Sequence, residues 1–250
     1  MTAVPEGFRI TVIGCSGTYS STGSSCSSYL VRTPTTSVLL DAGPGSSIEL
    51  QRHIDLAALD AIIISHEHPD HWTELPILYH AYRYGIERAG VPTYGTAGTK
   101  RLLDTVSPEA ASTAFSWTTI TADSALTIGD VSFSFSETDH PVETLAILAR
   151  SADATIGYSA DTGPGWSPEA FDEKIDVFVY ETTLPESLED TGIPHVSGRE
   201  AGTRATAADV GHLVITHVPP GHDSADREIS ARTTFSGQIS VAEPGLTIFS

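Results

Sequence analysis

The chain has 250 residues, 40% of them hydrophobic and 18% charged, which is ordinary for a soluble globular protein. Its formal net charge of −19 repels polyanions, so broad nucleic-acid binding is disfavoured. We expect neither a membrane-spanning helix nor a secretory signal, because no long apolar run and no basic start followed by an apolar segment occurs. Cys15 and Cys26 are the only cysteines and are compatible with free thiols in a reducing cytoplasm. A soluble cytoplasmic protein is therefore expected.

The first half of the chain is predicted to alternate strands with helices. Val- and Ile-rich runs indicate buried strands, and apolar residues spaced three and four apart indicate helices. Turn-forming segments such as Asp41-Ala42-Gly43-Pro44-Gly45 separate them. Strands are expected at residues 8–13, 29–32, 37–40, 60–65 and 91–94, and helices at residues 46–53, 72–85 and 98–106.

The second half repeats this pattern more loosely. Ser197 is expected to cap a helix, with Glu200 at the capping-box spacing. The whole pattern predicts an α/β protein with one compact domain over residues 1–250, because no linker or low-complexity tract interrupts it. Strands are expected at residues 131–136, 144–149, 155–159, 176–180, 212–216, 239–241 and 246–249, and helices at residues 168–171, 198–208 and 223–235.

The most informative segment is residues 62–71, in which a run of isoleucines leads into a loop rich in histidine. His66 and His68 are two residues apart and can converge on one metal ion from an extended loop. Asp70 and His71 follow where the chain turns into a helix, and can serve a second ion. Imidazole and carboxylate groups suit zinc, manganese or iron. The alternative is a polar surface loop that happens to be histidine-rich.

Three further residues follow predicted strands at the same topological position. His140, Asp161 and His217 each come just after a strand, and open α/β sheets place their sites at such ends. Taken alone, Asp161 can also be a turn-former in Asp-Thr-Gly. Two divalent ions are the predicted cofactors, with zinc as first choice and manganese or iron as alternatives. The predicted ligands form two sets bridged by Asp161, namely His66, His68 and His140, and Asp70, His71 and His217.

A centre of this kind favours hydrolysis. Two ions about 3.5–4 Å apart can hold a bridging hydroxide and polarise a phosphoryl or acyl oxygen. The sequence contains no P-loop, no dinucleotide-binding glycine motif and no serine nucleophile elbow. Kinase, dehydrogenase and serine-hydrolase activities therefore have no support.

The order of these ligands along the chain resembles that of the metallo-β-lactamase superfamily. The resemblance implies an αββα sandwich, in which two mixed β-sheets pack face to face with helices outside. Within the superfamily the chain is most similar to the tRNase Z-like branch of phosphodiesterases, although Glu74 replaces a glycine that is usual there. The likeness is carried by Gly14-Cys15-Ser16-Gly17-Thr18, Ser27-Ser28-Tyr29-Leu30, Trp72-Thr73-Glu74-Leu75-Pro76, Glu181-Thr182-Thr183 and His195-Val196-Ser197.

The resemblance also implies catalytic roles. His195 would donate a proton to the leaving oxygen and Glu181 would orient it, while Asp70 would act in catalysis as well as in metal binding. Without contact between them, His195 is only a helix-start histidine and Glu181 a strand-end glutamate. Ser16 and Thr18, with nearby backbone N–H groups, are candidates to cradle the substrate phosphate.

The expected substrate follows from departures from tRNase Z. No basic glycine-rich arm is present, and the charge of −19 has the wrong sign for RNA. These departures resemble the actinobacterial cyclic-nucleotide phosphodiesterases, whose sequences share a Tyr-Arg-Tyr and a Thr-His-x-Pro-Pro segment with Tyr82-Arg83-Tyr84 and Thr216-His217-Val218-Pro219-Pro220. We expect a phosphoric diester hydrolase for a small nucleotide such as 3′,5′-cyclic AMP. No membrane or stable nucleic-acid partner is expected, and the resemblance implies a homodimer.

Three other functions stay open. RNA 3′-end processing uses the same chemistry, and a lactone or thioester hydrolase would use the same centre on a carbonyl. A binding protein that kept the scaffold is disfavoured by the complete ligand set. Tyr82-Arg83-Tyr84 can stack on a base, but the surface of an amphipathic helix is the favoured interpretation.

Overall fold

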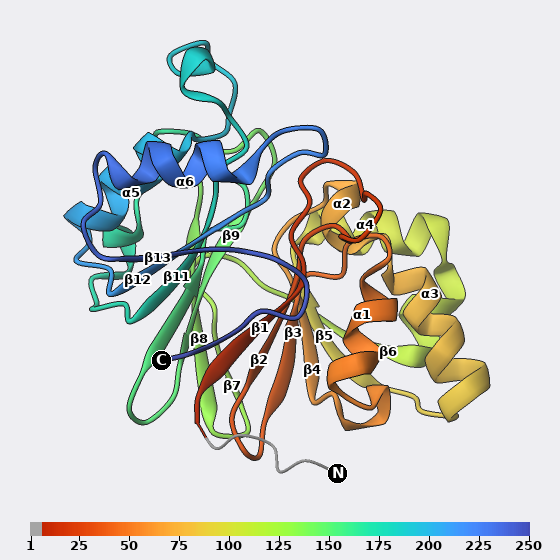
Figure 1. Cartoon of the computed structure of the whole chain (residues 1–250). Coiled ribbons are helices and arrows are strands. Elements are labelled where there is room, and N and C mark those ends of the chain that lie inside the picture. The colour runs from red at the N-terminus through yellow and green to blue at the C-terminus, as the bar shows by residue number, and fades with distance from the viewer. Residues whose placement is uncertain (1–6) are drawn as a thin grey trace.

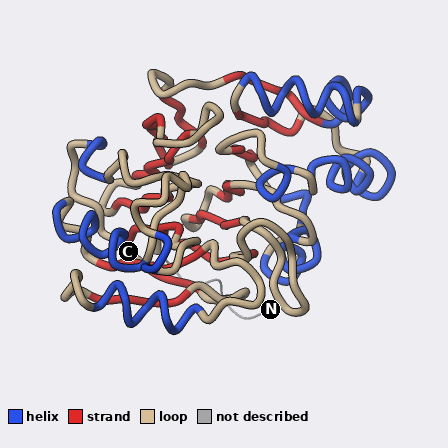
Figure 2. The backbone as a smooth tube through the Cα atoms, turned by 90° about the horizontal axis from the view of Figure 1, so that it is seen from above, coloured by secondary structure: helices blue, strands red, loops and turns tan. Residues whose placement is uncertain are grey.

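The computed structural model describes residues 7–250 and contains two seven-stranded sheets. The sheets pack face to face, and helices lie on their outer sides (Figures 1 and 2). The expected αββα sandwich is confirmed. Among the described residues, no helix is long and apolar enough to cross a membrane.

The first sheet is built from the first half of the chain and completed by the last strand. It is antiparallel from β14 to β3 and parallel from β3 to β6. Its order is β14 (Thr247–Phe249), β1 (Arg9–Gly14), β2 (Ser28–Arg32), β3 (Ser37–Leu40), β4 (Ala61–Ile64), β5 (Val91–Gly95) and β6 (Phe115–Thr119).

The second sheet is antiparallel over its first four strands in chain order and parallel over the rest. Because β8 and β10 both pair antiparallel with β9, they run in the same direction as the parallel strands β11 and β12. Its order is β13 (Gln238–Val241), β12 (His212–Thr216), β11 (Val177–Glu181), β10 (Thr155–Tyr158), β9 (Leu145–Arg150), β8 (Val131–Glu137) and β7 (Ala125–Ile128).

Six α-helices and several short helical turns are found in residues 7–250. The helices α1, α3 and α4 lie beside the first sheet, and α5 and α6 cover the second (Figure 1). The α-helices are α1 (Ser46–His53), α2 (Pro69–Trp72), α3 (Leu75–His80), α4 (Ala97–Val106), α5 (Gly198–Ala207) and α6 (Ser224–Arg232). The short turns are η1 (Leu56–Ala58), η2 (Ala81–Ile86), η3 (Ala110–Ala114), η4 (Pro168–Phe171) and η5 (Glu186–Leu188).

Strand β4 shows why these residues fold as they do. Side chains of successive strand residues point to opposite faces. Ile63 faces the core between the two sheets, whereas Ile62 and Ile64 face the helices α1 and α3. A strand that is covered on both faces is apolar throughout, which explains the unbroken run of isoleucines.

Two regions differ from the sequence-based expectation. The helix predicted at residues 72–85 is three short pieces, α2, α3 and the π-helical η2, and it begins earlier, at Pro69. The break occurs where the backbone N–H of Glu74 bonds to Ala42 O at 3.0 Å, and its carboxylate accepts from Gly45 N and Ser47 Oγ. Strands β6 and β7 were not predicted, because their Ser/Thr/Ala-rich surroundings give a weak alternating pattern.

The capping box at the start of α5 is confirmed. Ser197 Oγ accepts from the backbone N–H of Glu200 at 3.1 Å, and the Glu200 carboxylate accepts from Ser197 N at 3.0 Å. The Tyr82-Arg83-Tyr84 segment lies in the π-helical η2, where Tyr82 is buried and donates to Leu56 O and only Tyr84 of the two tyrosines is exposed.

Candidate metal centre

The histidine-rich loop begins where β4 ends and passes directly into α2. His68 is the N-cap residue of α2 and Pro69 occupies its first turn, so the two-residue spacing of His66 and His68 belongs to extended chain. Asp70 and His71 lie within the helix. The turn is tied to the first sheet, because Ala42 N donates to His71 O at 2.7 Å. One ligand pair thus comes from extended chain and the other from a helix.

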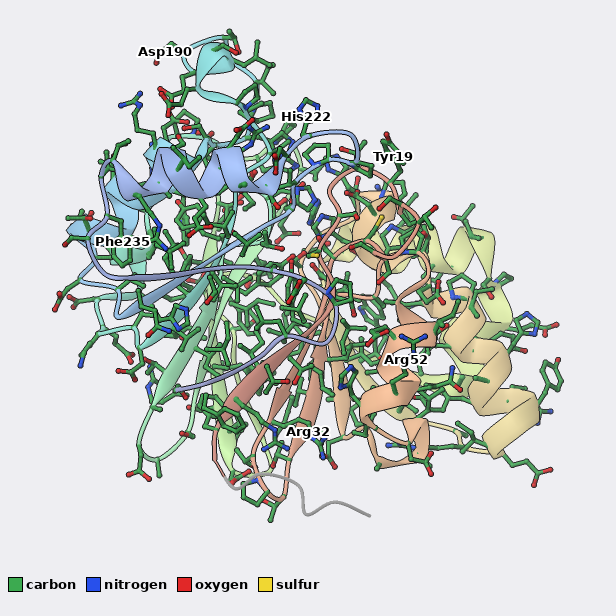
Figure 3. The ribbon with its side chains drawn as sticks, in the orientation of Figure 1. Tyr19, Arg32, Arg52, Asp190, His222 and Phe235 are labelled. Atoms are coloured by element: carbon green, nitrogen blue, oxygen red, sulfur yellow. The ribbon has the colours of Figure 1, made fainter. Side chains whose placement is uncertain are left out.

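The remaining predicted ligands come from the second sheet. His140 follows β8, Asp161 follows β10 and His217 follows β12. Since these strands run in one direction, their carboxyl ends meet at the same edge of the sheet. Tyr19 and His222 lie near this end of the molecule and Arg32 lies at the opposite end (Figure 3).

The structure brings all seven predicted ligand residues together. Within each group the candidate ligand atoms lie within 4.8 Å of one another. The groups correspond to the two predicted sets, with Asp161 assigned to the first: His66, His68, His140 and Asp161 form one, and Asp70, His71 and His217 form the other.

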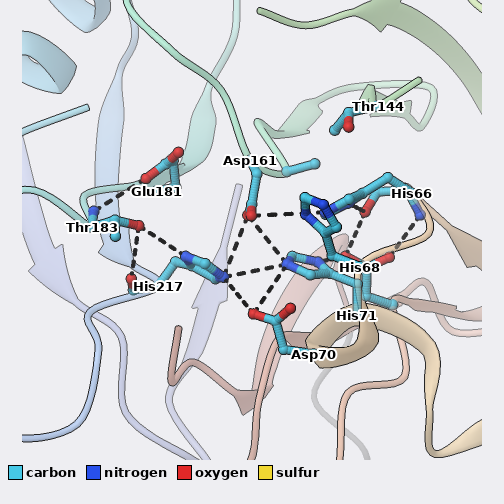
Figure 4. Close-up of polar contacts among 12 residues, drawn as sticks. His66, His68, Asp70, His71, Thr144, Asp161, Glu181, Thr183 and His217 are labelled. Carbon is cyan, nitrogen blue, oxygen red and sulfur yellow. Dashed lines mark hydrogen bonds and ion pairs between the residues drawn. The ribbon is translucent and has the colours of Figure 1, made fainter. Parts of the chain in front are cut away.

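The carboxylate of Asp161 lies between the two groups (Figure 4). Its Oδ2 is 3.7 Å from His66 Nε2 and 4.0 Å from His140 Nε2. Its Oδ1 is 3.2 Å from His71 Nε2 and 3.3 Å from His217 Nε2. Each oxygen therefore serves a different group, which is the geometry that a bridging ligand requires.

Several imidazole nitrogens in these groups lie close to one another, within 3.3 Å. His140 Nε2 lies 3.0 Å from His68 Nδ1, and His71 Nε2 lies 3.3 Å from His217 Nε2. His66 Nε2 is buried without a hydrogen-bond partner among the described residues. Buried polar atoms are normally satisfied, so the unpartnered His66 nitrogen beside these close ring pairs indicates a cation. The buried His/Asp clusters are consistent with a binuclear metal site.

Asp41 orients two of the ligands, and sequence reasoning assigned it only to a turn. It is fully buried, and its Oδ2 lies 2.7 Å from His71 Nδ1. The same oxygen accepts from Ser65 Oγ and Tyr158 OH, both at 2.8 Å, and Ser65 Oγ is 3.0 Å from His66 Nδ1. These bonds place the protons of both imidazoles on Nδ1, so both Nε2 atoms are free to bind metal.

Replacing Asp41 by Asn is expected to weaken metal binding about 10–100-fold, the usual cost of losing such an outer partner. Asn tolerates the positive φ of 57° at this position, so the backbone need not move. Competition with a chromogenic chelator measures the affinity. Asp60→Asn is the matched control, because Asp60 accepts from Ser37 N away from the site. Equal affinity in both variants would show that Asp41 does not act on the ligands.

The pKa values of the buried histidines in the site are shifted in opposite directions. Burial lowers the pKa of His66 well below its ordinary value, so this imidazole is neutral, as a ligand must be. Burial also lowers the pKa of His71, but Asp161 and Asp41 raise it well above its ordinary value. Burial raises the pKa of Asp161, whereas His217 and His71 lower it well below that of a free carboxyl. Protons and divalent cations thus compete for the same carboxylate-flanked nitrogens.

Glu181 and His195 form a hydrogen-bonded pair beside the two groups. His195 Nδ1 lies 2.7 Å from Glu181 Oε1, and a ring nitrogen of His195 lies within 4.8 Å of the ligand atoms of Asp161 and His217. The Glu181 carboxylate is buried and also accepts from Thr162 N and Thr183 N. Burial lowers the pKa of His195, but Glu181 raises it to about 9. The predicted contact between the two side chains is present.

Arg227 holds the segment that carries this pair, and no motif or spacing predicted this role. It lies on α6 and is 5% exposed. Its Nε donates to Thr182 O at 3.0 Å and its Nη2 donates to Thr183 O at 3.3 Å. Thr183 Oγ1 in turn lies 3.0 Å from His217 Nδ1. Arg227 therefore holds one segment that orients both His195, through Glu181, and His217.

In the predicted phosphate cradle, Ser16 and the backbone N–H of Thr18 are already hydrogen-bonded to other protein groups. Ser16 is buried and its hydroxyl donates to Ser24 O, while its backbone N–H bonds to Ser25 O. The backbone N–H of Thr18 donates to Asp70 Oδ2 at 2.8 Å. This loop therefore positions a predicted ligand, and only the exposed Thr18 hydroxyl stays a candidate for substrate contact.

Comparisons with known proteins agree with this geometry. The family model of the β-lactamase superfamily domain matches residues 36–218, and the chain belongs to this family. It is a hydrolase of the metallo-β-lactamase fold, related to proteins with and without an assigned activity.

The first of these relatives is the probable metallo-hydrolase YhfI of Bacillus subtilis, which is 28% identical over 95% of this chain and 98% of its own length. The crystal structure of YhfI superposes with a TM-score of 0.89 at 26% identity, covering 98% of this chain and all of YhfI. The uncharacterized protein Rv1339 of Mycobacterium tuberculosis is 32% identical over 92% of this chain and 88% of its own length. A ribonuclease Z of Mycobacterium bovis is 30% identical over 86% of this chain and 88% of its own length.

Proposed function

We propose that this protein is a dinuclear-metal phosphodiesterase that hydrolyses small nucleotide diesters, with 3′,5′-cyclic AMP as the expected substrate. The observation that carries the proposal is the Glu181–His195 pair next to two bridged ligand groups. A phosphodiester has a poor leaving alkoxide, which needs a proton, and a histidine held by a carboxylate can supply it. The phosphodiester-cleaving relative ribonuclease Z supports the same chemistry.

The residues of this chain would divide the reaction between them. His66, His68 and His140 would hold one ion, Asp70, His71 and His217 the other, and Asp161 both. When bound, two divalent cations stabilise charge on the phosphoryl oxygens and lower the pKa of a water molecule. The water oxygen forms the new bond to phosphorus, the bond to the leaving oxygen breaks, and His195 transfers its proton to that oxygen. Glu181 keeps His195 oriented and stabilises its protonated form.

The net charge of the chain favours small nucleotides over RNA as substrates. A polynucleotide brings many phosphates towards a protein of net charge −19, whereas a cyclic mononucleotide brings one. RNA 3′-end cleavage is the second candidate, because the ribonuclease Z relative spans most of the chain. A thioester hydrolase is less favoured, because a thiolate leaves without a dedicated acid, and the substrate panel below distinguishes a lactone hydrolase.

A substrate panel tests the proposal. Zinc-loaded and manganese-loaded protein is offered bis(p-nitrophenyl) phosphate, 3′,5′-cyclic AMP, a precursor tRNA with a 3′ trailer, and an acyl-homoserine lactone. We expect turnover of the two small diesters and little of the other two. Cleavage of the precursor tRNA at a higher kcat/KM than cyclic AMP would favour the second candidate, and turnover of the lactone alone would overturn the proposal.

A further inference from the structure

The segment between β11 and α5 forms a small cavity beside His195. It projects from the body of the molecule above α5, with Asp190 near its tip (Figures 1 and 3). The cavity has a volume of about 170 Å³, and His195 is itself part of its wall. Nothing in the metal centre or the Glu181–His195 pair requires a cavity on this side.

The same segment holds both the cavity and the catalytic histidine in place. His195 N donates to Ile193 O at 2.8 Å, and Leu184 N donates to Val196 O at 3.0 Å. Glu189 accepts hydrogen bonds from Ser197 and Arg199 at the start of α5. The position of the cavity relative to His195 is therefore fixed by backbone and side-chain bonds.

The lining of the cavity combines apolar side chains with carboxylates. Leu184 and Pro194 line it, and so do Leu188 and Ile193, which are each 39% exposed although they are large and apolar. Asp139, Asp190 and Glu200 also contribute to the lining. Such a lining suits a flat, uncharged group of the ligand, because the apolar side chains can pack against it. The carboxylates repel any second phosphate group.

The proposed reaction indicates which part of the substrate occupies the cavity. A proton donor must lie within hydrogen-bond distance of the leaving oxygen, so the group that carries this oxygen lies on the His195 side of the phosphorus. His195 lines the cavity and also lies within 4.8 Å of the ligand atoms of Asp161 and His217, so the cavity and the metal centre share this residue. Its volume is below the roughly 300 Å³ at which pockets for drug-sized ligands begin, so it fits one part of a nucleotide rather than the whole.

We propose that this cavity binds the nucleobase of the substrate and that Leu188 is a specificity-determining residue. The proposal rests on the proposed phosphodiesterase function. The base packs against the apolar wall while the phosphate stays at the metal centre. Because the carboxylates oppose a second phosphate, the site selects mononucleotides over longer chains.

The test compares ligands with and without a base, and needs no turnover. Calorimetric titration of the zinc-loaded protein measures Kd for AMP and for ribose 5-phosphate. We expect AMP to bind the wild type at least about ten-fold more tightly, because one apolar contact changes recognition by about 10–200-fold. Leu188→Ala should remove most of this difference and Leu188→Met should keep it.

Ile77→Ala is the matched control, since Ile77 is an exposed aliphatic residue on α3 and does not line the cavity. Equal binding of the two ligands to the wild type, or an unchanged difference in Leu188→Ala, would overturn the proposal. Hydrolysis of bis(p-nitrophenyl) phosphate is followed in the same preparations. Its absence from the wild type counts against the phosphodiesterase, whereas its presence without base-dependent binding counts against the base site alone.

Discussion

Replacing His195 by Ala is expected to lower kcat for 3′,5′-cyclic AMP by about 10²–10⁴-fold, the range of a general acid, while both metal ions remain bound. His195 is not one of the seven predicted ligands, and its Nδ1 is held 2.7 Å from Glu181 Oε1. Its loss therefore removes a proton donor without removing a metal ligand. Elemental analysis and steady-state kinetics on the same preparation measure both effects.

The leaving group provides the internal control for this variant. The p-nitrophenolate of bis(p-nitrophenyl) phosphate departs without a proton, so His195→Ala should lose much less activity towards it. His53→Ala serves as the matched variant, because His53 Nε2 also lies 2.9 Å from a glutamate, Glu49, but on the surface of α1. An equal loss for both substrates, or a loss of metal, would mean that His195 acts structurally or as a ligand.

Replacing Asp161 by Ala is expected to abolish the centre. One carboxylate oxygen faces each ligand group, so its removal breaks both sites at once. The loss of activity should well exceed the roughly 100-fold that the loss of an outer partner can cost. The metal content should fall from about two ions to less than one, as expected when a bridged pair loses its bridge.

The control for this variant is Asp60→Ala, which removes an aspartate that bonds Ser37 N instead of a histidine. Circular dichroism checks that both variants stay folded. A preparation of Asp161→Ala that keeps two ions and its activity would contradict the bridging role.

The parts of the site that were predictable from the sequence are those encoded locally. The isoleucines of β4 and the spacing of His66, His68, Asp70 and His71 lie within one continuous segment. The strand ends before His140 and His217 could be read in the same way, because a buried strand followed by a polar residue is a local pattern. Shared strand direction then brings these segments to one edge of the sandwich.

The orienting residues could not be predicted, because their roles arise only from tertiary contacts. Asp41 looks like a turn residue in the sequence, yet it bonds His71, thirty positions away, and Tyr158 of the other sheet. Arg227 reads as a charge on a solvated helix, yet its guanidinium reaches the carbonyls of Thr182 and Thr183. Neither contact leaves a periodicity or a spacing in the sequence.

Two bound ions and this set of residues are together expected to hydrolyse a small phosphodiester. Titration of metal-free protein with zinc or manganese, while the hydrolysis of 3′,5′-cyclic AMP is followed, measures this dependence. We predict that the rate rises to a plateau at about two equivalents per chain, as a two-metal centre requires. A plateau at one equivalent, or no hydrolysis at two, would contradict the account.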